Sequence, residues 1–291
     1  MKKMIRMAAV LLAVLMLFPA AGAFADTGAL GGGEPQPAPT PTPQSEAPTS
    51  SGTSASAGLG DTPPPAPAST PKPVPASGSG GASAPANAKE EPGIKYVALT
   101  FDDGPSSSNT PKTLDMLKKY GVRATFFVLG SRVKGNEALL GRMVDEGHEI
   151  GSHAYSHKRL TSLSIESVEY EMQRTNSLVY AACGVTPRLM RPPYGSRNAR
   201  VLACLAEMGF PCVLWSIDPE DWKATSARAV RDYVVTRAKN GSIILMHDLK
   251  STSVAAAEMI VKDLLARGYV FVTVSELLGG SPKAGATYTH G

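Results

Sequence analysis

The sequence predicts an α/β domain whose parallel strands are covered by helices, and two observations support this class. Short apolar runs of strand character alternate with segments of helical character over residues 93–278. This alternation is typical of βαβ units, which build parallel sheets. About seven such units fit into these residues, a number that favours a small (β/α) barrel, although periodicity alone also permits an open sheet.

The expected elements follow from apolar periodicity and from the residues that end each segment. Residues 96–101 form an apolar run that Gly104 and Pro105 terminate, and this run is the first strand. Further strands are expected at residues 124–129, 149–152, 188–190, 212–217, 242–246 and 269–274. Helices are expected at residues 110–120, 137–146, 164–182, 198–208, 226–239 and 252–266. Gly121 and Gly147 follow the first two helices, where glycine commonly ends a helix.

Residues 1–25 have the pattern of a signal peptide. A basic start at residues 2–6 precedes an apolar run at residues 7–18, and residues 23–25, Ala-Phe-Ala, match a small-x-small cleavage site. The apolar run is short for a membrane span, so we expect cleavage before Asp26, with an uncleaved anchor as the alternative. The mature protein is then expected to be secreted and to have no transmembrane anchor.

Residues 26–92 differ in composition from the rest of the chain. Fourteen of the 24 prolines lie between residues 31 and 90, and no aromatic residue precedes Tyr96 after the predicted cut. Such a segment cannot bury enough apolar surface to offset the entropy of ordering, so it predicts a disordered Pro/Ser/Gly-rich spacer. The tail at residues 279–291 is also expected to be disordered, which leaves residues 93–278 as one folded domain.

The formal net charge is +4, and no cluster of Lys and Arg indicates binding to nucleic acid. We expect the protein to be a monomer. The three cysteines, Cys183, Cys204 and Cys212, have no metal-type spacing. The favoured interpretation is that all three are small buried apolar residues, with one disulfide plus a free thiol as the alternative.

Two adjacent carboxylates, Asp102 and Asp103, follow the first strand at the end where α/β folds place their functional residues. Alone, an Asp-Asp-Gly-Pro sequence is more often a solvated turn. His153 and His157 follow the third strand, and two imidazoles four residues apart can bind one metal ion. With Asp103 they form a two-histidine, one-carboxylate set, which leaves a position open for water.

Other polar residues follow three later strands. Arg191 comes after residues 188–190, and a fixed guanidinium there usually pairs with a carboxylate, for which Asp102 is the candidate. His247 ends the strand at 242–246 and is interpreted as a general acid because a metal site is nearby. The strand at 212–217 leads into Asp218, Asp221 and Trp222. This tryptophan suits a sugar-stacking wall, and capping of the core is nearly as well supported.

Five segments together resemble the motifs of the polysaccharide deacetylase family, also called the NodB homology domain or carbohydrate esterase family four. They are Thr-Phe-Asp-Asp-Gly-Pro at 100–105, His-x-x-x-His at 153–157, Arg-Pro-Pro-Tyr-Gly at 191–195, Asp-x-x-Asp-Trp at 218–222 and Leu-x-His-Asp at 245–248. The resemblance covers residues 94–278. It implies a distorted (β/α) barrel with an incomplete set of parallel strands, in agreement with the pattern of elements.

The resemblance also implies a role for each site residue. Asp102 is expected to be the general base, held by Arg191, and His247 the general acid. The metal ligands are expected to be Asp103, His153 and His157, usually of Zn²⁺, with Co²⁺, Ni²⁺ or Mn²⁺ as alternatives. The backbone N–H of Tyr194 is expected to donate to an oxyanion, and Trp222 and Leu245 to line the acetyl pocket. Asp218 is favoured as the residue that orients His247, with Asp221 as the alternative.

The expected function is removal of acetyl groups from N-acetylglucosamine of a cell-wall polysaccharide, with peptidoglycan favoured. Alternatives are an O-deacetylase of xylan, a deacetylase of chitin or poly-N-acetylglucosamine, and a non-catalytic glycan-binding module. One departure from the family pattern is Ala154, where the family usually has Ser or Thr. The missing hydroxyl normally steadies the ligand loop, so its absence is expected to weaken the support of the metal site.

Overall fold

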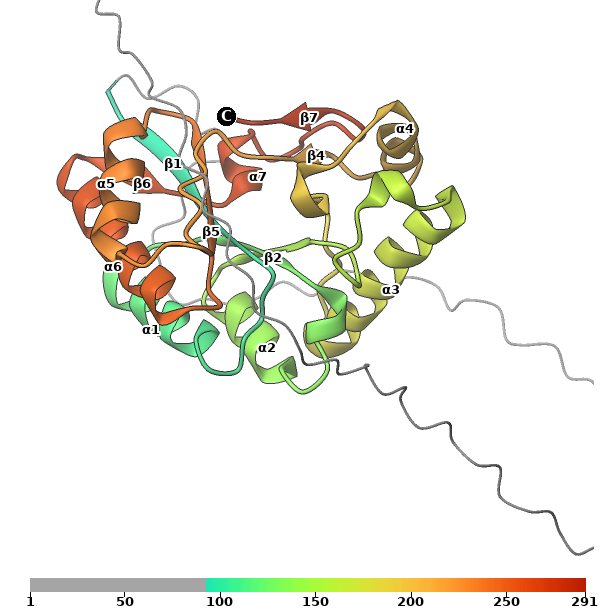
Figure 1. Cartoon of the computed structure of the whole chain (residues 1–291), viewed down its shortest axis with the longest axis horizontal. Coiled ribbons are helices and arrows are strands. Elements are labelled where there is room, and N and C mark those ends of the chain that lie inside the picture. The colour runs from blue at the N-terminus through green and yellow to red at the C-terminus, as the bar shows by residue number, and fades with distance from the viewer. Residues whose placement is uncertain (1–92) are drawn as a thin grey trace, which may run out of the picture. The chain divides into compact units, whose positions relative to one another are not determined.

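The computed structural model describes residues 93–291 (Figure 1). The predicted signal peptide at 1–25 and the spacer at 26–92 lie outside the described residues. Within them, strands and helices alternate as the sequence predicts. None of the helices in residues 93–291 combines the length and the apolar character that a bilayer span requires.

The main sheet has five strands, and all of its pairings are parallel. Strand β1 (Lys95–Asp102) lies between β2 (Thr125–Val128) and β5 (Ser242–His247), and β3 (Glu149–Ser152) follows β2. Strand β6 (Tyr269–Phe271) pairs with the beginning of β1. The parallel α/β class predicted from the sequence is therefore confirmed.

The six long helices lie on the outside of the strands (Figure 1). They are α1 (Thr110–Tyr120), α2 (Glu137–Asp145), α3 (Ile165–Cys183), α4 (Ala199–Glu207), α5 (Ala227–Arg237) and α6 (Ser251–Ala266). Each lies within about two residues of the predicted range, and several have recognisable caps. Ser164, for example, accepts a hydrogen bond from the Ser167 N–H at the start of α3, and Gly121 ends α1 with a φ of 62°.

Two of the predicted strands are much shorter than the sequence indicated. Residues 188–190 contribute one bridging residue, Met190, and the segment at 212–217 contributes β4 (Cys212–Val213) and a bridge at Ile217. The Ser216 and Ile217 N–H groups both donate to Ile243 O, and this two-to-one pairing interrupts the ladder. The bridges place both segments beside the main sheet, but they do not establish the closed barrel.

The prediction of a disordered tail at residues 279–291 is wrong. The tail contains β7 (Thr287–Tyr288), which pairs in parallel with β4. The Leu214 N–H donates to Tyr288 O at 2.7 Å, and the last residue, Gly291, donates to Gly241 O at 2.9 Å. The tail is rich in Gly, but the edge of β4 needs a hydrogen-bond partner, and the tail supplies it.

A short helix near the C-terminus was not predicted. The expected strand at 269–274 ends at Phe271, and α7 (Val274–Leu277) follows. Thr273 and Glu276 form a capping box, in which each side chain accepts a hydrogen bond from the other residue's backbone N–H. This reciprocal pair explains why a helix begins at Val274, although the apolar run predicted a strand up to that residue.

Alternation along β1 decides which side chains face the site. Val97, Leu99 and Phe101 belong to the large apolar cluster that also includes residues of the helices. Thr100 and Asp102 occupy the alternate positions of the strand and therefore point to the opposite face of the sheet. The cysteines at 183, 204 and 212 are all free. Cys204 and Cys212 are buried as the favoured interpretation expected, but Cys183 is only partly buried, so that interpretation is wrong for this residue.

Candidate active site

The two carboxylates at the end of β1 have different surroundings. Asp102 is 2% exposed and is the last residue of the strand. Asp103 has a φ of 68°, in the left-handed region that non-glycine residues seldom adopt. This change in the backbone turns the Asp103 side chain away from the strand's alternation, so neighbouring carboxylates can serve two different partners.

Asp102 pairs with Arg191, as the sequence predicted. The Arg191 guanidinium is fully buried and donates from Nη1 to Asp102 Oδ1 and Thr100 Oγ1, both at 2.7 Å. It also donates to the carbonyl oxygens of Val213 and Leu214, and it lies 4.1 Å from the centre of the Phe127 ring. This network fixes Asp102 and leaves its second oxygen, Oδ2, for another partner.

Asp103, His153 and His157 form a group that could hold a metal ion. Their candidate ligand atoms all lie within 4.8 Å of one another. Asp103 Oδ1 is 3.4 Å from His153 Nε2 and 3.1 Å from His157 Nε2. Asp103 Oδ1 is also buried and accepts no hydrogen bond from the described residues. A buried carboxylate oxygen facing two imidazole nitrogens fits a divalent cation that prefers nitrogen and oxygen ligands.

Hydrogen bonds on the far side of each imidazole orient the two histidines. His153 Nδ1 lies 2.7 Å from Arg191 O, and a carbonyl only accepts, so Nδ1 carries the proton. The Nε2 lone pair of His153 then points toward Asp103. His157 Nδ1 lies 3.1 Å from the Tyr194 hydroxyl. Such partners fix the ring orientation and the tautomer that a metal ligand needs.

The pKa shifts in this group favour a charged carboxylate and a neutral imidazole. Burial alone would raise the pKa of Asp103, but His157 and His153 outweigh it and lower the pKa to about 2. Burial lowers the pKa of His153, despite the nearby Asp102 and Asp103. An ionised Asp103 and a neutral His153 are the protonation states in which both side chains can bind a metal ion.

His247 is oriented by Asp221, so the preference for Asp218 was wrong. His247 Nδ1 lies 2.8 Å from Asp221 Oδ1, and the backbone N–H of His247 donates to Asp221 Oδ2 at 3.0 Å. Asp218 instead accepts a hydrogen bond from the Glu220 N–H. The chain turns at Glu220, which has a φ of 52°, and Asp221 follows as a fully buried residue. This turn separates the roles of the two carboxylates.

The surroundings of His247 favour its protonated form. Burial alone would lower the pKa of this imidazole, but the hydrogen bond with Asp221 and the charges of Asp102 and Asp103 raise it to about 9. The other ring nitrogen, Nε2, is 3.9 Å from Asp103 Oδ2. A protonated imidazole beside the candidate metal centre is positioned to donate a proton.

Most of the predicted site residues line one cavity of about 480 Å³. These are Asp102, Asp103, His153, His157, Tyr194, Asp218, Trp222, Leu245 and His247. Arg191 and Asp221 lie behind this wall and hold Asp102 and His247. Trp222 is 52% exposed, which excludes the core-capping alternative and leaves its ring available to a ligand.

Two residues of the cavity wall, Trp215 and Glu220, were not predicted. Trp215 is close enough to Gly195 that a Cβ there would lie 3.1 Å from the indole ring. Glycine at 195 has no Cβ to press against the indole ring, and it adopts the φ of 61° without strain. An aromatic residue near the end of the predicted strand at 212–217 was the one indication available in the sequence.

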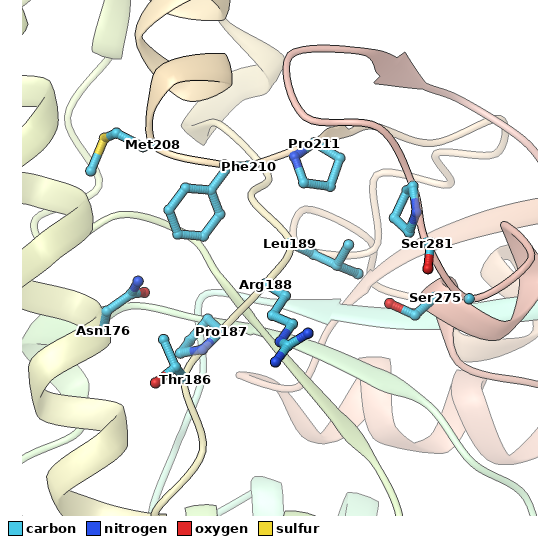
Figure 2. A pocket seen from close by; sticks show the side chains of 13 residues that line it. Asn176, Thr186, Pro187, Arg188, Leu189, Met208, Phe210, Pro211, Ser275 and Ser281 are labelled. Atoms are coloured by element: carbon cyan, nitrogen blue, oxygen red, sulfur yellow. The ribbon is translucent and has the colours of Figure 1, made fainter. Parts of the chain in front are cut away.

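A second cavity, of about 450 Å³, lies among residues of α3, the segments at 186–189 and 208–211, and the tail (Figure 2). Its lining contains no His, Asp or Glu. Arg188 is its one charged residue, and Leu189 and Phe210 contribute apolar surface. The first cavity therefore contains the candidate acid, base and metal ligands, and the second does not.

We expect Asp221→Asn to shift the alkaline limb of the pH–rate profile to lower pH. Loss of the carboxylate removes the hydrogen bond that raises the pKa of His247, so less imidazolium is present at a given pH. At neutral pH, kcat is expected to fall by about 10- to 100-fold, less than the roughly 10²- to 10⁴-fold contribution of a general acid, because His247 itself is retained. Asp218→Asn is the matched control and is expected to leave the limb in place. An equal shift in both variants would contradict the assignment.

These residues define a class of α/β domain in which a two-histidine, one-carboxylate centre lies at the ends of the strands. A candidate base and a candidate acid lie on either side of this centre. The chain belongs to the polysaccharide deacetylase family, whose model matches residues 89–213. The resemblance noted in the sequence is therefore confirmed.

Individual relatives support the same assignment. The chain is 45% identical over 194 residues to PgdA of Listeria monocytogenes, a peptidoglycan-N-acetylglucosamine deacetylase, and the match covers 67% of this chain and 41% of that protein. It is 44% identical over 187 residues to PdaC of Bacillus subtilis, a peptidoglycan-N-acetylmuramic acid deacetylase, over 64% of this chain and 39% of that protein. The chain thus spans about two fifths of the length of these curated relatives.

The fold is also similar to that of solved deacetylases. The structure of T48 deacetylase with substrate has a TM-score of 0.64 to this chain and is 44% identical in sequence. The match covers 67% of this chain and 96% of the T48 chain.

Proposed function

We propose that this protein is a secreted, metal-dependent N-deacetylase of cell-wall polysaccharide. The single observation that supports this best is the complete set of functional groups on one cavity: a buried carboxylate, a paired imidazole and three candidate metal ligands. N-acetylglucosamine of peptidoglycan is the favoured substrate, because PgdA of Listeria monocytogenes is a peptidoglycan-N-acetylglucosamine deacetylase.

Asp102 is proposed as the general base. Its Oδ1 is occupied by Arg191, and its Oδ2 lies 3.8 Å from His153 Nε2, beside the metal centre. The carboxylate would accept a proton from the attacking water through Oδ2. Arg191 keeps the carboxylate in one orientation throughout, so no reorganisation is needed when the proton arrives.

His247 is proposed as the general acid. An amide nitrogen cannot leave as an anion, so the amine must receive a proton as the carbon–nitrogen bond breaks. The imidazolium form that Asp221 supports provides this proton from Nε2. The products are acetate and a free amino sugar.

The Tyr194 N–H is proposed to stabilise the oxyanion. Tyr194 has a φ of 60° and lies between Pro193 and Gly195 in a short 3₁₀ turn. Among the described residues, no group accepts a hydrogen bond from this N–H, although the N–H groups of Gly195 and Ser196, which follow it, are both paired. A backbone donor fixed by an adjacent proline suits an oxyanion, because it is already oriented before charge develops.

Asp103, His153 and His157 would hold the divalent ion, for which Zn²⁺ is favoured and Co²⁺, Ni²⁺ or Mn²⁺ are alternatives. When bound, such an ion supplies Lewis-acid polarisation of the acetyl carbonyl and lowers the pKa of water. The exposed Trp222 ring and the buried Leu245 side chain are proposed to form the wall of the acetyl pocket. We also propose that the bridged strands form a distorted barrel and that the protein acts as a monomer at the cell wall.

N-acetylmuramic acid is the second candidate substrate, since PdaC of Bacillus subtilis is a peptidoglycan-N-acetylmuramic acid deacetylase. Xylan, chitin and poly-N-acetylglucosamine remain alternatives. A glycan-binding module without activity is disfavoured, because nothing in a binding role requires a buried acid–base pair at the metal centre.

Acetate release from a panel of polysaccharides tests this proposal. The panel contains peptidoglycan, chito-oligosaccharide and acetylated xylan, each with and without a chelator. We expect release from peptidoglycan, loss of release with the chelator, and recovery when a divalent ion is added in excess. Activity that resists complete chelation would overturn the metal centre. Release from xylan alone would overturn the proposed substrate and the cleavage of an amide, because xylan carries O-acetyl esters, but not the metal centre.

A further inference from the structure

The loop that carries both histidine ligands is strained. Ala154 and His157 have φ values of 63° and 59°, in the left-handed region that is strained for non-glycine residues. Such a conformation persists only where the surroundings determine it. The hydroxyl expected at position 154 is absent, and the Ala154 side chain is instead buried in an apolar cluster. The loop must therefore be held from elsewhere.

Hydrogen bonds to two separate elements hold this loop. On one side, the N–H groups of Gly130 and Ser131 donate to the carbonyl oxygens of Ala154 and Tyr155, each at 3.0 Å. A Cβ at Gly130 would lie 2.5 Å from Thr175 Oγ1 on α3, so the loop, the turn at 130–132 and α3 approach closely. These contacts satisfy the carbonyl groups of the loop but not its N–H groups.

Glu171 on α3 satisfies the loop's N–H groups. Its Oε2 accepts hydrogen bonds from the N–H groups of Tyr155 and Ser156, at 2.8 and 2.7 Å. Its Oε1 accepts a hydrogen bond from the Ser156 hydroxyl. Glu171 is 5% exposed, and no Lys or Arg pairs with it in the part of the chain that the structure describes. All three of these bonds go to Tyr155 and Ser156, two of the three residues between His153 and His157.

We infer that Glu171 is the positioning residue that sets the metal affinity of this site. It does not contact the ligand nitrogens. It fixes the backbone between the two histidines, and this backbone determines whether both Nε2 atoms face Asp103. Without it, the partly buried N–H groups of Tyr155 and Ser156 lose their acceptor, and the strained backbone of His157 is free to relax. This inference rests on the metal centre proposed above and extends it to a residue on a different element.

The test is the dissociation constant for Zn²⁺ of the purified protein, measured by competition with a chromophoric chelator. We expect Glu171→Ala to weaken binding by about 10- to 100-fold, the range found for residues that support metal ligands. Glu171→Gln is expected to recover most of the affinity, because its amide oxygen can accept both N–H groups. Ser156→Ala removes one of the three bonds and is expected to weaken binding by about two- to tenfold. Glu169→Ala, on the same helix, is the control.

Thermal unfolding of the metal-free variants separates positioning from general stability. If Glu171→Ala lowers the Tm of the apoprotein but binds Zn²⁺ as tightly as the wild type, the inference is overturned. If Glu171→Ala does not fold, the Glu171→Gln and Ser156→Ala variants decide, and unchanged affinity in Ser156→Ala contradicts the inference. A wild-type protein that binds no divalent ion overturns the metal centre and this inference with it, whereas the same Zn²⁺ affinity in the wild type and in all variants overturns the inference alone.

Discussion

Asp102→Asn is expected to lower kcat by about 10²- to 10⁴-fold, the range of a general base. Asparagine has nearly the same shape and keeps an oxygen that accepts from Arg191, but it cannot take a proton from water. The effect on KM is expected to be small, because the base acts in the transition state rather than in binding. The measurement is steady-state acetate release, made well below the Tm of the variant.

Two comparisons make this prediction specific to the base. Zn²⁺ affinity is expected to survive in Asp102→Asn and to be lost in Asp103→Asn, because only Asp103 belongs to the candidate ligand group. Asp145→Asn, an exposed carboxylate at the end of α2, is the matched control and is expected to turn over normally. If Asp102→Asn retains wild-type kcat, or if it loses metal as Asp103→Asn does, the division of roles between the two carboxylates is wrong.

The location of the site could be predicted because parallel strands bring their carboxyl ends to one edge. Asp102, His153 and His247 are far apart in the sequence, yet each follows or ends a strand, so the topology places them together. The pairing of Asp102 with Arg191 followed from the same argument. Local sequence and sheet geometry sufficed for these residues.

The choice between Asp218 and Asp221 could not be made from the sequence. Both follow the same strand, and a spacing of three residues fits either one. The positive φ of Glu220 decides the matter, since it turns Asp221 inward beneath His247. Backbone turns of this kind depend on packing around them and leave no clear mark in the residue pattern.

Long-range contacts explain the other failures. The tail residues 287–288 are ordered by β4, which lies more than 70 residues earlier. Glu171 leaves a weak indication in the sequence, because it occupies the same helical face as Val168, Met172 and Thr175, all of which are buried. A glutamate on a buried face needs hydrogen-bond donors, but the sequence does not say that the ligand loop supplies them.

Arg191→Met is expected to produce the largest loss of stability. The guanidinium is fully buried, and its removal leaves the Asp102 carboxylate, 2% exposed, without a counter-charge. Breaking one side of a buried pair costs about 3–5 kcal/mol. For a domain of this size, that loss corresponds to a fall in Tm of roughly 6–20 °C. The measurement is thermal unfolding of the purified variant, followed by circular dichroism.

An exposed ion pair with the same nitrogen–oxygen distance provides the control for Arg191→Met. Lys119 Nζ lies 2.7 Å from Glu258 Oε1, the distance that also separates Arg191 Nη1 from Asp102 Oδ1. Lys119→Met is expected to leave Tm nearly unchanged, because water screens an exposed pair. Burial, rather than distance, would then account for the difference between the two variants.

The double variant Arg191→Met with Asp102→Asn tests whether the loss arises from an unpaired charge. If it does, removing both charges is less damaging than the sum of the single changes, and the double variant recovers part of the Tm lost in Arg191→Met. If the two losses simply add, Arg191 stabilises the protein through its bonds to the Val213 and Leu214 carbonyls and its packing on Phe127. In that case Arg191 supports the sheet, and its position beside the general base is a consequence of that support.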